Sequence, residues 1–328
     1  MLTSEKPTFP QRTTPYGAPD AAAGLPDLPG HTGAAPQMAP PMQQQMWGAG
    51  MMGIQPGITQ GERTVVGGIA FDNVTMADAV TRIGMMVQKA DHPCMVCTGN
   101  LDHLVMLQQD AEFRAIYAES ELVLADGMPV VWLSRLAHWR QAAVPALRER
   151  VAGSDLFWEL GRASALMGLR LFFLGGAPGA AERAAEVMQQ RYPGAEICGI
   201  YCPPFDTFET PEEQERIRVR IREAQPDILL VGFGAPKQEK WIAANRYRLG
   251  VPVSIGVGGS FDMAAGVFKR APKWIQRLGM EWLYRMAQDP GRLGKRYLGR
   301  DLPYLFTLLF QTLRGNSGGK PATGHPAS

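Results

Sequence analysis

The stretch PDILLVGFGAPKQE, residues 226–239, is the most direct indication of the fold class. Its apolar run Ile228–Phe233 has the length of one buried strand, and Gly234 separates that run from a helix that we predict over Gln238–Arg248. An apolar strand without polar alternation is typical of a parallel sheet that helices cover on both faces. The stretch therefore predicts an α/β protein.

Strand and helix alternate along the chain on both sides of this stretch. We predict further strands over Arg63–Phe71, Pro93–Thr98, Leu122–Ala125, Leu169–Leu174, Ala195–Tyr201 and Val253–Val257. We predict further helices over residues 75–88, 101–119, 128–136, 154–167, 180–192 and 211–224. This order favours a Rossmann-like parallel sheet with helices on both faces.

The two ends of the chain have a different composition. The first sixty residues contain ten Pro, eight Gly and six Met. Such a segment buries too little apolar area to offset the entropy lost on ordering, which predicts a disordered arm over 1–62. The Gly/Pro/Ser-rich end predicts a second disordered segment over 315–328. We divide the remainder into an α/β domain, 63–272, and a helical appendage, 273–314.

Charge and hydropathy argue against two classes of protein. The 33 basic residues nearly balance the 31 acidic ones, so the chain lacks the basic coating of a nucleic-acid-binding protein. No apolar run approaches the ~18 residues that a membrane-spanning helix needs. The first residues also lack the basic and apolar segments of a secretory signal. We expect a cytoplasmic or peripheral protein.

The cysteines predict neither a metal centre nor a disulfide. Cys94 and Cys97 form a C-x-x-C pair, but they lie on a predicted strand, where an odd separation places the two sulfurs on opposite faces. Cys198 and Cys202 are too far apart on an extended chain to pair. We predict four reduced core thiols.

Glycine and small polar residues follow five of the predicted strands. Because the carboxyl ends of parallel strands meet at one rim of a sheet, we expect these residues to gather there. They are Thr98-Gly99-Asn100, Asp126-Gly127, Gly175–Gly179, Gly234–Glu239 and Gly258–Asp262. Glycine turns corners in any α/β protein, but five such loops on one rim favour a nucleotide or another phosphate-bearing ligand.

Three common phosphate-binding patterns are absent from the sequence. It has no G-x-G-x-x-G after a predicted strand, no G-x-x-x-x-G-K-[ST] and no D-x-D. These absences argue against a dinucleotide-dependent dehydrogenase, a P-loop NTPase and a metal-bridged diphosphate. If a diphosphate leaves in the reaction, arginines must stabilise its charge.

The segment from Lys269 to Arg300 carries nine basic and two acidic residues. It is also amphipathic, with apolar residues at helical spacing: Trp274, Ile275, Leu278, Trp282 and Met286. Basic, aromatic and apolar residues together are typical of a helix on an anionic membrane surface. A helix packed on its own domain or on a partner subunit has the same composition, and the sequence leaves the two interpretations equal.

The order of these motifs resembles the WecG/TagA/CpsF family of bacterial glycosyltransferases, glycosyltransferase family 26. The resemblance covers about Val65 to Tyr297, and its blocks are Thr98–Asn100, Leu124–Gly127, Arg150–Asp155, Leu174–Gly179, Pro226–Glu239, Gly256–Asp262, Lys269–Pro272, Glu281–Arg285, Pro290–Arg292 and Arg296-Tyr297. The arm before Arg63 and the lengthened stretch Ala137–Leu147 lie outside the family pattern.

The resemblance implies an activity. Members of this family transfer a sugar from a UDP-sugar to a polyprenyl-diphosphate-linked saccharide, with inversion and without a metal or another cofactor, at the inner face of the cytoplasmic membrane. The family's proposed base maps to Asp126. Its C-terminal appendage is held to close the site on the membrane and deliver arginines, which map to Arg285, Arg292 and Arg296.

Several candidate residues keep a second interpretation. Asp126 is the expected base, or it caps the following helix. Glu239 is a rival base, or a first-turn residue that the helix dipole stabilises. Thr98, Asn100 and Gln238 either contact the sugar or the uracil, or form hydrogen bonds with the loop backbone. Asp262 either holds a ribose hydroxyl or caps a turn. Arg150 either pairs with Asp155 or contacts the acceptor diphosphate.

Glycines and neighbours of the same rim complete the predicted binding site: Gly127, Gly175, Gly176, Gly234, Pro236, Lys237, Gly258 and Gly259. His103 is interpreted as incidental, within a helix. Two other functions compete with sugar transfer, namely a nicotinamide-dependent oxidoreductase on the same kind of sheet and a non-catalytic membrane scaffold. Self-association is a further possibility for an exposed apolar end.

Overall fold

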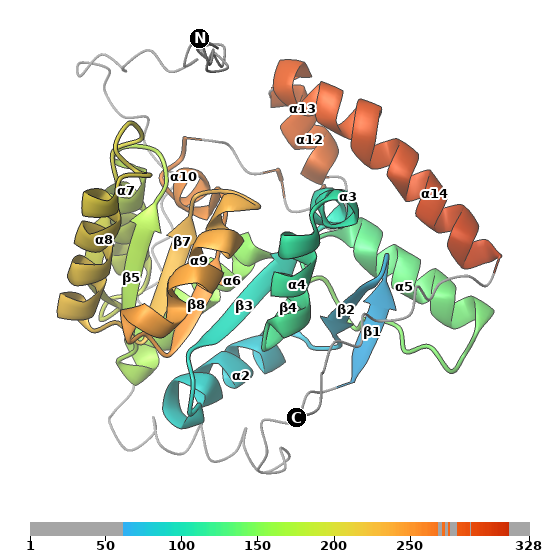
Figure 1. Cartoon of the computed structure of the whole chain (residues 1–328). Helices are drawn as coiled ribbons and strands as arrows, with labels where there is room; N and C mark the ends of the chain where they lie inside the picture. Colours follow the sequence, from blue (N-terminus) through green and yellow to red (C-terminus); the bar gives the residue numbers. More distant parts are fainter. Residues whose placement is uncertain (1–61, 268–270, 273–274, 276–280, 289, 315–328) are drawn as a thin grey trace, which may run out of the picture. The chain divides into compact units, whose positions relative to one another are not determined.

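A computed structural model describes residues 62–267, 271–272, 275, 281–288 and 290–314 (Figure 1). The predicted arm and the predicted tail, 315–328, lie outside these residues, apart from Glu62. The side chains of Trp282, Arg285, Arg292, Leu293 and Lys295 also lie outside the description. All described residues belong to one compact unit, Met38–Ser328.

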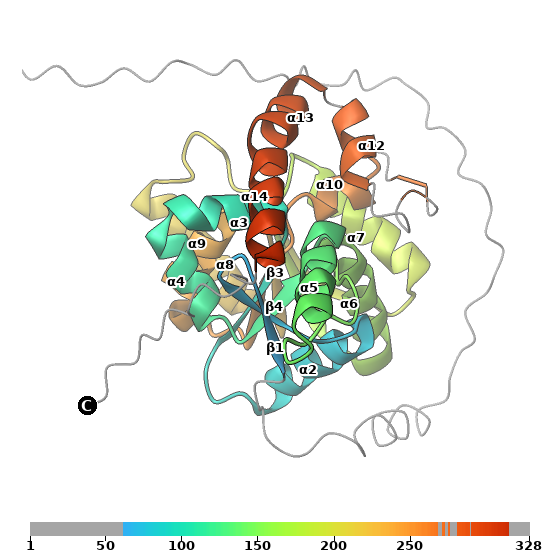
Figure 2. The ribbon, with the colours of Figure 1, turned by 90° about the vertical axis from the view of Figure 1, so that its right-hand side faces the viewer.

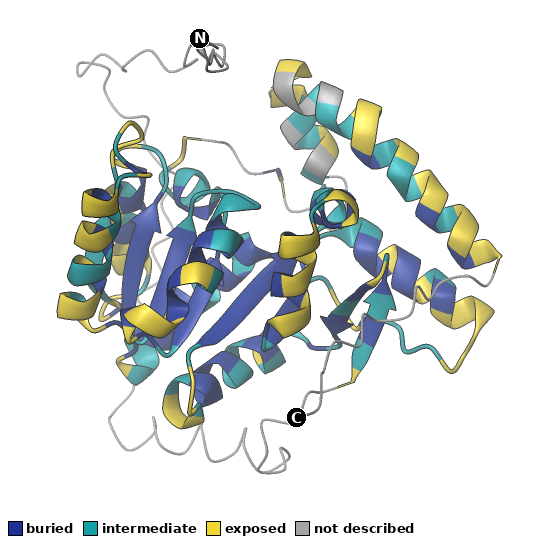
Figure 3. Cartoon of the chain, viewed as in Figure 1, coloured by how far each residue is buried: buried dark blue, intermediate teal, exposed yellow. Residues whose placement is uncertain are grey.

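Six parallel strands form the central sheet, in the order β4-β3-β8-β7-β5-β6. They are β3 (Cys94–Gly99), β4 (Leu122–Ala125), β5 (Arg170–Gly175), β6 (Glu196–Tyr201), β7 (Ile228–Gly232) and β8 (Val253–Gly256). Strands β3, β4 and β8 are buried throughout, and Figure 3 shows the middle of the sheet in dark blue. The predicted parallel sheet is confirmed, including the strand in the opening motif.

Helices cover both faces of this sheet. One apolar core lies under α2 (Met76–Lys89), α6 (Gly153–Met167), α7 (Ala180–Arg191) and α10 (Ser260–Ala264). The other lies under α3 (Leu101–Gln109), α4 (Ala111–Glu119), α5 (Met128–Arg140), α8 (Pro211–Ala224) and α9 (Lys237–Leu249). Phe172 and Phe173 of β5 enter opposite cores, because successive side chains of a strand point to opposite faces.

The prediction of one strand over Arg63–Phe71 is wrong. The segment is an antiparallel hairpin of β1 (Arg63–Val66) and β2 (Ile69–Asp72), which forms a separate two-stranded sheet. Gly67 and Gly68 both have positive φ, 58° and 84°. Two consecutive residues of positive φ make the two-residue turn whose twist suits a hairpin, so the Gly-Gly pair folds the segment back on itself.

The predicted helix over 101–119 is likewise two helices, α3 and α4. Asp110 separates them in an extended conformation, with φ −118° and ψ 100°. Its carboxylate accepts a hydrogen bond from the Phe113 backbone N–H at 2.9 Å and so caps α4. An aspartate inside an amphipathic run therefore starts a new helix here.

The thiols of Cys94 and Cys97 lie in opposite cores, as their odd spacing predicts. All four cysteines are free, although Cys198 and Cys202 are half-buried rather than core residues. Burial raises the pKa of both buried thiols, to about 11 for Cys94.

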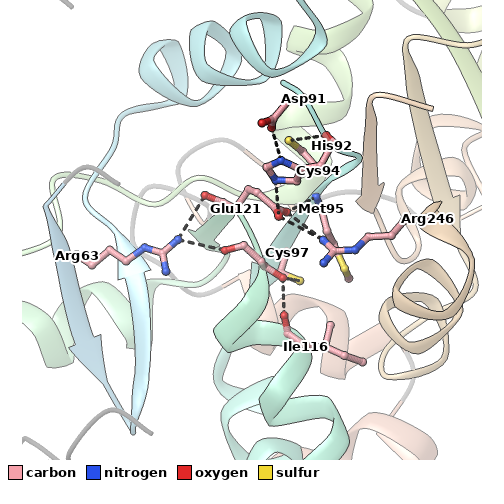
Figure 4. Close-up of polar contacts among 10 residues, drawn as sticks. Arg63, Asp91, His92, Cys94, Met95, Cys97, Ile116, Glu121 and Arg246 are labelled. Carbon is pink, nitrogen blue, oxygen red and sulfur yellow. Dashed lines mark hydrogen bonds and ion pairs between the residues drawn. The ribbon is translucent and has the colours of Figure 1, made fainter. Parts of the chain in front are cut away.

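Glu121 joins several elements at the amino-terminal edge of the sheet (Figure 4). Its carboxylate accepts a hydrogen bond from the Met95 backbone N–H at 2.6 Å and pairs with Arg246 of α9 at 3.2 Å. It also lies 3.3 Å from Nε2 of His92. This cluster closes the edge of the sheet opposite the predicted rim.

The last described elements are α12 (Glu281–Gln288), α13 (Pro290–Arg296), the π-helical turn η1 (Tyr297–Asp301) and α14 (Leu302–Leu313). Helix α14 lies beside α5, as Figures 1 and 2 both show. Its Leu308 enters the core under α3 and α5, whereas Phe306 and Phe310 remain exposed. One side of this helix therefore packs on its own domain. No helix of the described chain is long and apolar enough to span a membrane.

Candidate active site

Two adjoining cavities lie at the carboxyl ends of the strands. The first, which we call the rim cavity, measures about 140 Å³, and the second, the helix cavity, measures about 190 Å³. The rim cavity is enclosed by the loops after β3, β4, β7 and β8, and the helix cavity by α5 and the C-terminal helices. Four side chains line both cavities: Asn100, Asp126, Arg150 and Glu281.

Asp126 follows β4 and lies where the two cavities meet. It does not cap α5, whose N-cap Gly127 has no side-chain capping bond. Instead, its carboxylate accepts a hydrogen bond from the Gly153 backbone N–H, the first of α6, at 3.2 Å. The N-terminus of a helix favours negative charge. The capping interpretation for α5 is therefore wrong, and the carboxylate is held at the N-terminus of α6 instead.

Arg150 lies against Asp126 and pairs with two further carboxylates. Its guanidinium lies 3.0 Å from Asp155, as one interpretation of the sequence predicted, and 3.0 Å from Glu281 of α12. Burial lowers the pKa of Arg150, but attraction from Asp126, Glu281 and Asp155 outweighs burial and raises it. A permanent positive charge is thus held between the cavities, and Glu281 ties it to the C-terminal helices.

Thr98 and Asn100 follow β3 and line the rim cavity. The Thr98 hydroxyl donates to the Gly256 carbonyl at 3.3 Å, which joins the loops of β3 and β8. The Asn100 side chain accepts from the His103 backbone N–H at 3.2 Å and caps α3. Both side chains therefore serve the loop backbone and also belong to residues that line the rim cavity.

Gln238 fastens two loops of the rim together. Its side-chain oxygen accepts from the backbone N–H groups of Gly234, at 3.2 Å, and Gly258, at 3.0 Å. Its amide nitrogen donates to Glu239 at 2.7 Å. The loops after β7 and β8 are therefore held in register by one buried side chain that also lines the rim cavity.

Glu239 is fully buried and lines neither cavity. Burial raises its pKa to about 7, against the lowering effect of the hydrogen bond from Gln238. Its second carboxylate oxygen has no hydrogen-bond partner within the described chain. Glu239 therefore lies behind the cavity wall, with Gln238 between it and the rim.

The loop after β5 lies beside the rim cavity without lining it. Gly175 has φ 95°, and a Cβ there would come within 2.7 Å of the Phe233 ring, so only glycine fits. Asp262 accepts from the Ala177 backbone N–H at 3.1 Å and so holds this loop, as the turn-capping interpretation predicted.

The remaining rim residues divide between the cavities and their surroundings. Gly258 and Gly259 line the rim cavity, and Gly127 lines the helix cavity. Lys237 lies away from both, with its ammonium 3.5 Å from the centre of the Phe208 ring and 3.4 Å from Glu209. Six other predicted residues also fall outside the two linings, namely Gly175, Gly176, Gly234, Pro236, Glu239 and Asp262.

Of the three predicted C-terminal arginines, Arg296 has a side chain that the structure describes. Arg296 lines the helix cavity, with its guanidinium 3.2 Å from Asp102 and donating to the Tyr297 hydroxyl at 2.9 Å. Arg300 pairs with Asp102 and with the buried Asp301. The side chains of Arg285 and Arg292 lie outside the described residues.

Several residues of the site were not predicted. Asp102 and Asp301 hold the arginines, and Glu281 was recognised only as part of a motif without a role. His103 lines the rim cavity with Nδ1 2.6 Å from the Tyr117 hydroxyl, so it is a wall residue rather than incidental. Burial, with a contribution from Arg296, lowers its pKa to about 4, which keeps the imidazole neutral at neutral pH. Within the described residues, no three His, Cys, Asp or Glu side chains are grouped to hold a metal ion.

Comparison with known proteins places the chain in a family. The model of the Glycosyl transferase WecG/TagA/CpsF family matches residues 64–318. An N-acetylglucosaminyldiphosphoundecaprenol N-acetyl-beta-D-mannosaminyltransferase of Bacillus subtilis (strain 168) is 34% identical over 184 residues, which are 56% of this chain and 67% of the relative. The enzyme of the same name from Staphylococcus aureus (strain MW2) is 30% identical over 230 residues, 70% of this chain and 85% of the relative.

The match spans the sheet, the loops of both cavities and the C-terminal helices, and it bears out the resemblance read from the motifs. The relatives carry the names of sugar-transferring enzymes. The chain therefore belongs to the WecG/TagA/CpsF family of glycosyltransferases and is a hexosyltransferase.

Proposed function

We propose that the chain transfers a sugar from a UDP-sugar to a polyprenyl-diphosphate-linked saccharide, with inversion and without a metal, in the assembly of a cell-surface or exopolysaccharide at the inner face of the cytoplasmic membrane. The names of the relatives support an acceptor on a polyprenyl diphosphate. The observation that carries the proposal is that Asp126 lies on the walls of two adjoining cavities.

The rim cavity suits the donor. Its wall combines the backbone of Gly258 and Gly259 with the first turn of α6, through Ser154. Free backbone N–H groups at the start of a helix bind phosphate. Thr98, Asn100 and Gln238 add polar groups for the sugar or the uracil.

The helix cavity suits the acceptor, because one part of its wall is charged and the other is apolar. Arg150 and Arg296 supply positive charge for a diphosphate. The apolar part suits the first units of a lipid chain, and it consists of Met128, Pro129, Trp132, Leu302 and Leu305. The appendage, 273–314, thus contributes six of the fifteen residues that line this cavity, and we assign it the role of completing the site against the membrane.

The chemistry is a single displacement at the anomeric carbon. Asp126 takes the proton of the acceptor hydroxyl while that oxygen attacks, and the bond to UDP breaks with both electrons leaving on the diphosphate. Arg150, which lines both cavities, stabilises the negative charge of the leaving group. The family resemblance gives the same role to Arg285, Arg292 and Arg296. The Gly153 N–H holds the Asp126 carboxylate in place at the junction of the two cavities.

A donor screen tests this function. Purified protein is mixed with a short polyprenyl-diphosphate glycan and a panel of UDP-sugars in EDTA, and products are measured by mass spectrometry. We expect one donor to extend the acceptor by one hexosyl unit and to release UDP. An absolute requirement for a divalent metal overturns the mechanism, and binding of nucleotide without turnover for any donor overturns the function.

A further inference from the structure

His103 belongs to the wall of the rim cavity and lies in the first turn of α3. Its backbone N–H donates to the Asn100 side chain at 3.2 Å. Its ring lies edge-on to two buried aromatic rings, with its centroid 5.9 Å from that of Phe113 and 6.1 Å from that of Tyr117. His103 itself is 7% exposed. The imidazole is therefore held in one orientation at the cavity wall.

The hydrogen bond between His103 and Tyr117 fixes which ring nitrogen carries the hydrogen. Nδ1 lies 2.6 Å from the Tyr117 hydroxyl, which forms no other hydrogen bond within the described residues. If this buried hydroxyl accepted from Nδ1, its own hydrogen would be left without an acceptor, at a cost in free energy. The hydroxyl therefore donates to Nδ1, and the neutral ring carries its hydrogen on Nε2.

The Nε2–H group is left for a molecule in the rim cavity. No residue of the described chain forms a hydrogen bond with Nε2, and this atom is not fully buried. Burial lowers the pKa of His103 to about 4, so the ring is neutral at neutral pH. A neutral N–H group matches an uncharged oxygen, whereas a phosphate oxygen is matched better by the guanidinium of Arg150 in the same wall.

The place of His103 points to the sugar part of the donor. Helix α3 covers one face of the sheet and α6 the other, so the rim cavity runs across the sheet edge between them. The Gly258-Gly259 loop and the start of α6 suit the diphosphate. On the α3 side, His103 lies next to Asn100, which lines both cavities and so marks the junction where the transferred group meets the acceptor.

We propose that His103 donates a hydrogen bond from Nε2 to an uncharged oxygen of the transferred sugar, either a hydroxyl or the carbonyl of an acylamino group. Tyr117 is a positioning residue, because its hydroxyl sets the tautomer of His103. This inference rests on the proposed function and deepens it, since it assigns the α3 side of the rim cavity to the sugar.

NMR spectroscopy of the full-length protein with isotope-labelled histidine tests the contact. The His103 signals are assigned by their loss in His103→Gln. We expect a hydrogen on Nε2 and no titration of His103 between about pH 5.5 and pH 8. UDP is then added to one sample, and UDP-glucose, UDP-N-acetylglucosamine or UDP-N-acetylmannosamine to others. The Nε2 signal is expected to move with at least one UDP-sugar and to stay in place with UDP.

His92 is the control within the same spectra. It lies at the amino-terminal edge of the sheet, and its hydrogen bond to Asp91, with attraction from Glu121, raises its pKa. We expect His92 to titrate over this pH range and to be unaffected by every nucleotide. His92→Gln is expected to leave the affinity for UDP-sugar unchanged.

Substitutions measure the size of the contact. The double variant His103→Phe, Tyr117→Phe removes both partners of the buried hydrogen bond, so no hydroxyl is left unpaired. We expect its Kd for the UDP-sugar to rise about tenfold, the loss of one hydrogen bond, while its Kd for UDP stays within about twofold. His103→Gln keeps an N–H donor and is expected to lose at most about threefold. Tyr117→Phe is expected to leave His103 as a mixture of both tautomers.

Each contrary outcome is distinct. An equal loss of affinity for UDP and for the UDP-sugar overturns the proposal, because His103 then contacts the nucleotide. If no UDP-sugar moves the Nε2 signal, the contact fails whatever the turnover. If a UDP-sugar moves the signal but no sugar reaches a lipid-linked acceptor, the proposed function fails and the contact stands. If the double variant transfers sugar with the wild-type KM, the contact fails and the function stands.

Discussion

Two backbone segments that are distant in sequence and adjacent in the fold position Asp126. Strand β4 delivers it to the rim, and the first N–H of α6 holds its carboxylate at 3.2 Å. Asp126→Asn retains an acceptor for that N–H but cannot take a proton. We expect turnover to fall by about 10²–10⁴-fold, the usual contribution of a general base, while UDP affinity measured by calorimetry stays within about twofold. Unchanged turnover would remove Asp126 from this role.

Glu239 gives a second prediction, through pH. Burial raises the pKa of Glu239 from its ordinary value of 4.5 to about 7. Between these two pH values the carboxyl group is protonated in the folded protein and ionised in the unfolded chain. The free energy of unfolding therefore falls as pH rises from about 4.5 to 7 and stays lower above that range.

Glu239→Gln removes this titration while keeping an oxygen for the Gln238 amide. Between pH 5 and pH 8, the variant is expected to gain stability relative to the wild type, by up to about 3 kcal/mol, because each pKa unit is worth about 1.4 kcal/mol. Urea unfolding at the two pH values measures the gain. If the difference in free energy of unfolding between the variant and the wild type is the same at both pH values, Glu239 is ionised in the folded protein.

Sequence alone predicts a site residue when local structure places it at the rim. It misses a residue whose position depends on contacts between segments that are distant in sequence. Thr98, Asn100 and Asp126 directly follow apolar strands, so the parallel sheet alone brings them to one rim. Asp102 was missed because its pairing with Arg300 needs α3 to meet η1, almost two hundred residues away. Asp301 pairs with the adjacent Arg300, and only the packing of η1 shows that this carboxylate is buried at the cavity wall. Lys237 shares a motif with Gln238, yet the helix turns it toward Phe208 and away from the cavities.

At the scale of elements, the loop after β5 shows how closely one glycine is required. Gly175 combines a φ of 95° with a Cβ position 2.7 Å from the Phe233 ring. Gly175→Ala is expected to lower the free energy of unfolding by about 3 kcal/mol, through backbone strain together with overpacking. Urea denaturation measures the loss.

Gly168 is the control for that substitution. It ends α6 with φ 69° and has open space around its Cβ position. Gly168→Ala is expected to cost about 1 kcal/mol, the strain of the left-handed conformation alone. If both substitutions lower the free energy of unfolding equally, the Phe233 ring moves aside. The contact between that ring and a Cβ at position 175 is then not the reason that glycine is required.

Element boundaries were hardest to predict where a short local signal interrupts a long apolar pattern. Gly67-Gly68 turns one apparent strand into a hairpin, and Asp110 divides one apparent helix. In both cases the hydrophobic pattern continues across the break, because the pieces on either side contribute to the same core. The number of elements therefore follows from turn and capping residues, while the core face follows from the periodicity.

At the scale of the molecule, the site is divided between the α/β domain and the C-terminal helices. The rim cavity takes one wall residue, Glu281, from those helices, whereas the helix cavity takes Glu281, Arg296, Tyr297, Asp301, Leu302 and Leu305. The sequence predicted the appendage from charge and amphipathic spacing. It did not predict that Leu308 packs in the core, since that contact depends on α14 lying along α5.

A chain that ends after Pro272 tests this division. We expect it to retain the sheet by circular dichroism, because the strands and both covering layers precede that residue. We expect UDP binding to survive with at most about tenfold loss, since one wall residue of the rim cavity is removed. Transfer to a lipid-linked acceptor is expected to be lost. Full transfer by the shortened chain would show that the C-terminal helices are dispensable.

The central claim is that the donor nucleotide lies in the rim cavity, within reach of the carboxylate at the junction of the two cavities. A crystal structure of the full-length protein soaked with UDP measures this directly. We predict density for UDP between the Gly258-Gly259 loop and the start of α6, with its diphosphate beside Arg150 and Asp126. UDP bound at any place remote from Asp126 would contradict the account.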